Sequence, residues 1–184
     1  MILPIVGYGN QVLRTRAEEI GPDYPELAQL IENMFETMYN AQGVGLAAPQ
    51  INLPIRLFVV DGSPMDEEDM KNFKKVFINA QKIEEKGTPW GFEEGCLSIP
   101  DIREVVRRRS DITLHYFDEN FEEKTETFSG MKARVIQHEY DHIEGILFMD
   151  HISNLRRSIM KPRLQKILRG DIEVEYPMKF SRRG

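Results

Sequence analysis

The chain is poor in cysteine, with Cys96 alone among 184 residues. A single thiol cannot form an intrachain disulfide, so nothing in the sequence points to an oxidising compartment. No apolar run approaches the roughly 20 residues that span a bilayer. The opening stretch MILPIVGYGN is too short for a signal peptide and lacks a basic leader. We therefore expect a cytoplasmic protein that does not cross a membrane.

An excess of positive charge is also lacking, since the formal net charge is −6. This balance does not favour binding to DNA. Hydrophobic residues make up 41% of the chain and charged residues 29%, as in ordinary globular proteins. The length suits a single domain over residues 1–184, and residues 153–184 are predicted to add a basic helix and an edge strand that pack on this domain or extend from it.

Hydrophobic periodicity predicts two main helices, at about 25–39 and 130–144, with Gly43 and Gly145 just beyond their ends. A third, basic helix is expected over 155–169, bent or starting late because Pro162 lies inside it. Alternating apolar residues predict an edge strand over 171–177. Further strands are predicted at 56–61, 76–78, 105–107 and 112–117. The predicted fold class is α+β, with mixed or antiparallel sheets around a central helix.

The second main helix contains QHEYDH, which has the pattern H-E-x-x-H at His138, Glu139 and His142. Residues four apart on a helix lie on one face, so both imidazoles can bind one ion. The glutamate can then lie near that ion as a general base without binding it. The alternative is that the two histidines are ordinary helix residues.

A third ligand is needed, and known metallopeptidase patterns do not supply it. Metzincins place a histidine where this chain has Phe148. Thermolysin-like enzymes use a glutamate from a later helix, but Glu173 and Glu175 lie in a strand-like tail. Cys96, in the glycine-containing turn EGCLSIP, is the better candidate, because one thiolate and two imidazoles leave a tetrahedral site with an open position. A lone cysteine is otherwise more often a small buried apolar residue.

Three motifs in this order, GVGLAAPQ, EGCLS and QHEYDH, resemble the signature motifs of peptide deformylases. The stretches ILPIVGYGNQVLR and GILFMD and most of residues 1–151 also resemble that family. The resemblance implies one catalytic domain that removes the formyl group from the N-terminal formylmethionine of nascent polypeptides. It also implies Fe²⁺ as the metal, with Zn²⁺, Ni²⁺ or Co²⁺ able to use the same ligands.

The resemblance also assigns roles to individual residues. Cys96, His138 and His142 would bind the metal, and Glu139 would act as general acid and base. The Gln50 amide and the Leu97 N–H would stabilise the oxyanion. Without the resemblance, Gln50 would be interpreted as a surface amide. The implied substrate-binding residues are Val44, Gly45, Phe92, Arg103, Met131 and Val135, and Arg134 is a polar departure among the mostly apolar pocket positions.

Some interpretations stay open. A metallopeptidase would use the same H-E-x-x-H helix, and a binding domain could hold a structural Cys-His-His zinc site, although no convincing fourth ligand is present. His115 and His151 are expected to be structural or surface residues. The stretch 155–169 has six Lys or Arg residues and no acid. It is typical of a solvated helix face, and contact with ribosomal RNA is the alternative.

Overall fold

The computed structural model describes residues 1–181. Its main α-helices are α1 (Leu27–Asn40), α2 (Gly130–Ile143) and α3 (Asn154–Arg169). The strands are β1 (Ile5–Val6), β2 (Gly45–Ala47), β3 (Leu57–Asp61), β4 (Lys74–Lys86), β5 (Trp90–Cys96), β6 (Ile99–Arg108), β7 (Asp111–Phe117), β8 (Glu123–Ser129) and β9 (Met178–Lys179). Short 3-10 turns are η1 (Gln11–Arg14), η2 (Ala48–Ile51), η3 (Glu68–Met70) and η4 (Phe148–His151). The α+β prediction is confirmed.

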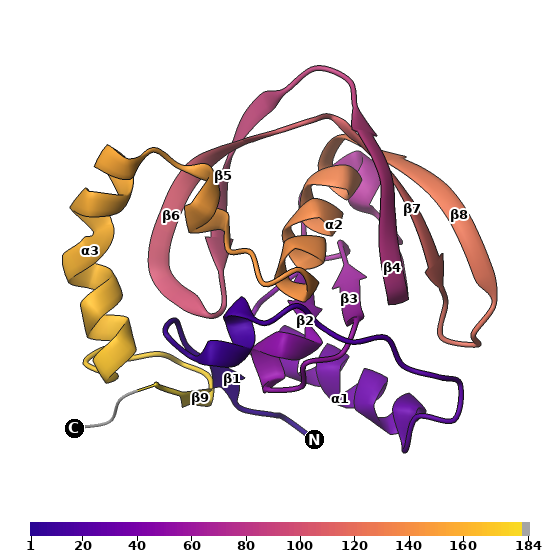
Figure 1. Cartoon of the computed structure of the whole chain (residues 1–184), viewed down its shortest axis with the longest axis horizontal. Coiled ribbons are helices and arrows are strands. Elements are labelled where there is room, and N and C mark those ends of the chain that lie inside the picture. The colour runs from indigo at the N-terminus through magenta and orange to yellow at the C-terminus, as the bar shows by residue number, and fades with distance from the viewer. Residues whose placement is uncertain (182–184) are drawn as a thin grey trace.

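Most strands belong to one antiparallel sheet with the order β2-β3-β4-β7-β8. β5 and β6 form a separate antiparallel hairpin, and β1 pairs with β9 in parallel. Figure 1 shows α2 at the centre, between β4, β7 and β8 on one side and the β5–β6 hairpin on the other. The central helix that the sequence predicted therefore lies inside the molecule.

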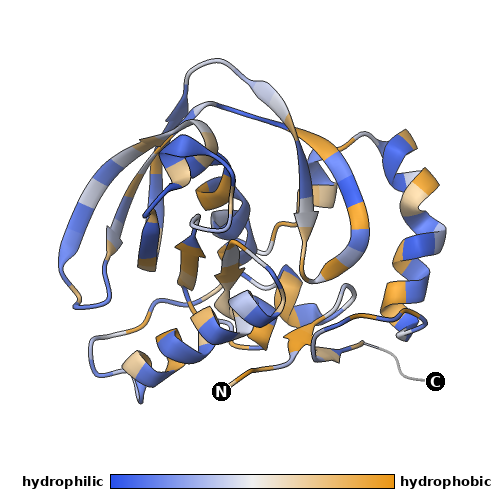
Figure 2. Cartoon of the chain, turned by 180° about the vertical axis from the view of Figure 1, so that it is seen from behind, coloured by the Kyte–Doolittle hydropathy of each residue, from blue (hydrophilic) through white to orange (hydrophobic). Residues whose placement is uncertain are grey.

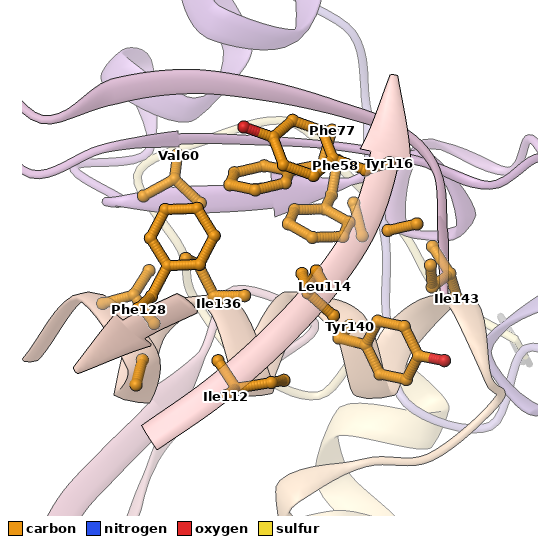
Figure 3. Close-up of a cluster of buried hydrophobic side chains, with 14 of the residues drawn as sticks. Phe58, Val60, Phe77, Ile112, Leu114, Tyr116, Phe128, Ile136, Tyr140 and Ile143 are labelled. Atoms are coloured by element: carbon orange, nitrogen blue, oxygen red, sulfur yellow. The ribbon is translucent and has the colours of Figure 1, made fainter. Parts of the chain in front are cut away.

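Strand β3 contributes to apolar clusters on both faces of the sheet. Phe58 and Val60 pack in the cluster that includes α2, whereas Leu57 and Val59 pack in the cluster that includes α1. Successive side chains of a strand point to opposite faces, so this continuous apolar run fills two cores. Figure 3 shows the α2 cluster, in which Ile136, Tyr140 and Ile143 of the helix face aromatic side chains of the sheet. This packing holds α2 in place over its whole length.

The C-terminal boundary of α2 depends on a glycine. Gly145 has φ +74, in the left-handed region, and a Cβ there would lie 2.8 Å from the backbone of Arg14. The Ile146 N–H donates to the Asp141 carbonyl at 2.9 Å, which closes the last turn. The helix therefore ends where the sequence predicted, within one residue.

Other boundaries differ from the prediction. α1 begins at Leu27 rather than Pro25, because Glu26 has a left-handed φ of 52°. α3 begins at Asn154 and includes Pro162, so a late start is wrong. The expected edge strand over 171–177 is also wrong: this stretch is irregular, and only β9 pairs with β1.

The predicted segment 153–184 thus corresponds to α3, which lies beside β6, and to the short strand β9, with residues 182–184 outside the described residues. α3 buries Leu164 and Ile167 and leaves Leu155 and Ile159 exposed. Figure 2 shows hydrophilic and hydrophobic stretches alternating along this helix. In residues 1–181, no helix combines the length and apolarity that a membrane crossing needs.

Candidate active site

The three predicted metal ligands come together from two elements. Cys96 is the last residue of β5, and His138 and His142 lie one turn apart on α2. One ligand atom from each lies within 4.8 Å of the other two, and Cys96 Sγ is 3.4 Å from His142 Nε2. The strand register shifts between Gly95 and Cys96, next to the tight turn into β6. Such irregularities change the direction in which a side chain points.

His138 is oriented by a buried carboxylate that sequence reasoning missed. Its Nδ1 lies 3.0 Å from Oε2 of Glu94. Burial alone would raise the pKa of Glu94, but hydrogen bonds from His138 and Arg108 and their charges lower it far below the usual value. An ionised carboxylate only accepts hydrogen bonds, so Nδ1 carries the proton and Nε2 is free to bind a metal.

Glu94 is also the centre of a buried ion-pair network. Arg108 donates to both of its carboxylate oxygens, at 2.7 and 3.1 Å, and Arg134 donates at 2.9 Å. Arg108 also donates to Asp141 at 2.7 Å, and His151 Nε2 lies 2.7 Å from the same Asp141 oxygen. These ion pairs join the metal-ligand helix α2, which carries Arg134 and Asp141, to Glu94 of β5 and Arg108 of β6.

Glu139 is buried, and burial raises its pKa to about 7 against the opposing charge of His138. Its Oε2 has no hydrogen-bond partner within residues 1–181. A Cβ added at Gly45 would lie 2.4 Å from Oε1 of Glu139, so only glycine leaves room for this carboxylate. A buried carboxyl group with a pKa near neutrality and a free oxygen can accept and return a proton.

Gln50 is almost fully buried, so the interpretation as a surface amide is wrong. Its Oε1 accepts from the Ala47 N–H at 2.9 Å, which fixes the orientation of the amide. Its Nε2 then lies 3.2 Å from Ser98 Oγ and 3.6 Å from Cys96 Sγ. The side-chain NH₂ group is thereby directed toward the cluster of metal ligands.

A cavity of about 820 Å³ opens onto this cluster. It is lined by Cys96, Leu97, His138, Glu139 and Gln50. All six predicted substrate-binding residues line it too, namely Val44, Gly45, Phe92, Arg103, Met131 and Val135. The remaining ligand, His142, is almost completely buried beneath it.

Comparison with known proteins assigns the chain to a family. The family model for polypeptide deformylase matches residues 2–158. The chain belongs to the polypeptide deformylase family. It is therefore an enzyme of that family.

The peptide deformylases of Christiangramia forsetii and Flavobacterium psychrophilum are each 56% identical to this chain and align with 98% of it. These alignments cover 96% and 97% of the two relatives. A crystal structure of a peptide deformylase from Legionella pneumophila has a TM-score of 0.81 and 36% identity, covering 93% of this chain and 98% of that one. The structure from Thermotoga maritima has a TM-score of 0.76 and 38% identity, covering 83% and 99%. Sequence and fold therefore agree on deformylase membership.

Arg134 is a buried member of the cavity wall of this deformylase-family chain. Its guanidinium carbon lies 4.4 Å from the centre of the Trp90 ring, and its Nη2 donates to the Trp90 carbonyl at 2.7 Å. Its charge is paired with Glu94. The cavity therefore meets a neutralised, aromatic-stacked guanidinium rather than an exposed cation.

The other two histidines lie where the sequence suggested. His115 pairs with Glu123 across β7 and β8, and His151 is partly exposed beside Asp141. Neither is in the metal-ligand group that the described residues form. A signal for the missed Glu94 did exist, because it is a carboxylate only two residues before the candidate ligand Cys96. Arg134, which the sequence marked only as a polar departure, lies four residues before His138 on one helix face.

Proposed function

We propose that the chain removes the formyl group from the N-terminal formylmethionine of newly synthesised polypeptides and releases formate. The observation that carries this proposal is the meeting of Cys96, His138 and His142 beside Glu139, at the base of a cavity. Family membership supports the substrate. Because the substrate is a nascent chain, we also propose that the enzyme works in the cytoplasm.

Cys96, His138 and His142 fit a divalent metal because one thiolate and two imidazoles leave a coordination position free, as in catalytic sites. The fixed tautomer of His138 and the short distance from Cys96 Sγ to His142 Nε2 support this assignment. We propose Fe²⁺, as the family resemblance implies, with Zn²⁺, Ni²⁺ or Co²⁺ accepted by the same residues. Such a metal would supply a nucleophile at neutral pH by lowering the pKa of water.

The residues around the site divide the remaining work. Glu139 takes a proton from the attacking water and returns it to the amine nitrogen as the carbon–nitrogen bond breaks. The Gln50 amide and the Leu97 N–H donate to the oxygen that becomes negative, and losing one such donor costs about 100- to 1,000-fold in rate. Val44, Phe92, Met131 and Val135 would hold the methionine side chain beside His138. Gly45 would contribute backbone contacts, and Arg103 would lie at the pocket rim.

The test measures formate release from formyl-Met-Ala-Ser by anaerobically Fe²⁺-loaded protein. We expect Glu139→Gln to lower kcat at least about 100-fold while metal content stays the same. Glu68→Gln, at an exposed side chain, is the matched control and should keep full activity. Absence of formate above the background of the Glu139→Gln variant would refute the proposal. Cleavage of internal bonds without preference for formylated ends would instead support the metallopeptidase alternative.

Contact between α3 and ribosomal RNA remains a hypothesis, with a solvated helix face as the alternative. α3 carries the six basic residues of 155–169, and Arg156 already pairs with Glu104 at 2.7 Å. Pelleting with ribosomes over a salt series tests the hypothesis, because phosphate contacts weaken steeply as salt rises. Neutralising Arg163 and Lys166 together should reduce pelleting, and unchanged pelleting would reject the contact.

A further inference from the structure

The segment after α3 forms part of the active-site cavity. Residues 173–176 line the same cavity as Cys96 and Glu139. The family model ends at residue 158, so this segment lies beyond it, whereas the relatives align over 98% of this chain. The segment is held at its far end by β9, which pairs with β1. A stretch outside the matched family region thus contacts the reaction site.

Tyr176 makes the direct connection. Its hydroxyl donates to the backbone carbonyl of Leu97 at 2.8 Å, across 79 positions in sequence. Its ring packs in the same apolar cluster as the Leu97 side chain. Burial, with the nearby Cys96 and Asp101, raises the pKa of Tyr176 well above its usual value, so the hydroxyl stays protonated and remains a donor.

Several hydrogen bonds besides the one to the Leu97 carbonyl hold the turn that joins β5 to β6. The Ser98 carbonyl accepts from the Tyr8 N–H at 2.8 Å, and Ser98 Oγ lies 3.2 Å from Gln50 Nε2. Residues in a tight turn have no ladder partners to fix their peptide planes. The hydrogen bond from Tyr176 fixes the plane that follows Leu97 and so restricts the rotation that would reorient its N–H.

We propose that Tyr176 is a positioning residue for oxyanion stabilisation, acting through the Leu97 backbone. This inference rests on the proposed function, in which the Leu97 N–H meets the developing negative charge. Donors of this kind work only when they are held in place before the reaction. Through Tyr176, the C-terminal segment would therefore contribute to the catalytic rate, although Tyr176 itself would not contact the reacting atoms of the substrate.

The test compares Tyr176→Phe, which removes one hydroxyl, with the wild-type protein. A net hydrogen bond corresponds to a change of about 3- to 10-fold, so we expect kcat to fall by that factor while KM changes less than about twofold. Tyr116→Phe is the matched control, because the Tyr116 hydroxyl donates to Glu126 on β8, outside the cavity lining. The control should leave both constants unchanged.

A second readout does not depend on activity. In Zn²⁺-loaded, diamagnetic protein, amide hydrogen exchange at Leu97 should be at least about threefold faster in Tyr176→Phe and unchanged in Tyr116→Phe. Unchanged kcat, or a lowered melting temperature with unchanged kcat and exchange, would overturn the proposal. If the wild-type protein releases no formate, the proposed function fails separately, and the Leu97 exchange rate still decides whether Tyr176 orders this turn.

Discussion

Replacing Glu94 with glutamine should destabilise the protein strongly, because the carboxylate is the shared partner of two buried guanidinium groups. Its side chain is 5% exposed, like that of Arg108, and Arg134 is even less exposed. Removing one partner of a buried ion pair costs about 3–5 kcal/mol. Arg108 keeps Asp141, and Arg134 keeps two backbone carbonyls, so we expect the lower end, about 3 kcal/mol.

Urea unfolding of metal-free protein measures this free energy without a contribution from metal binding. Glu93→Gln is the matched control, because Glu93 is the preceding residue on β5 and pairs with Arg103 at an exposed position. Exposed pairs contribute about 0–1 kcal/mol. A loss below about 1 kcal/mol for Glu94→Gln would refute the view that this carboxylate stabilises the fold.

The effect of Glu94→Gln on the free energy of unfolding should depend on pH. The pKa of Glu94 is lower in the folded state than its ordinary value of 4.5, so its stabilising contribution is complete above pH 4.5 and is lost as pH falls through the folded-state pKa. The difference in unfolding free energy between wild type and Glu94→Gln should therefore shrink as pH falls below 4.5. A difference that grew as pH fell would show that another group dominates the acid unfolding.

Two further predictions concern the site itself. Gly45→Ala should lower kcat about 100-fold and leave the protein folded, because the new Cβ displaces Glu139 by an ångström or more. Formate release measures the activity, and a melting curve checks the fold. Retained activity would contradict the prediction. Chelation should abolish activity but leave the far-UV circular dichroism unchanged, because β5 and α2 stay joined through the ion pair of Glu94 with Arg134. Unfolding on chelation would instead indicate a structural zinc site.

The sequence predicted correctly those helices and strands whose boundaries are encoded by residues within the element itself. α2 was expected at 130–144 and occupies Gly130–Ile143, because its apolar stripe and the glycine after it are encoded within one short stretch. β5 and β8 were missed, since both alternate polar residues with few apolar ones and owe their pairing to neighbouring strands. The 171–177 stretch alternates like a strand, but it pairs with no strand among residues 1–181.

In the candidate site, too, some residues could be predicted from the sequence and others could not. Cys96, His138 and His142 were grouped by the donor atoms that a metal needs and by family resemblance, and the structure brings them together. The partners of Glu94, which are Arg108, Arg134 and His138, lie 14, 40 and 44 residues away. The contact between Tyr176 and Leu97 spans 79 positions. No local pattern fixes such distant pairs, because they depend on how the β5–β6 hairpin packs against α2 and how the C-terminal segment packs against the hairpin turn.

Strand β3, with apolar side chains on both of its faces, has a consequence for how the protein melts. The layer containing α1 and the layer containing α2 share this strand, so neither layer can open without exposing residues that support the other. Backbone amides of α1 and α2 that exchange only on global opening should therefore report one common free energy, rather than two separately cooperative units.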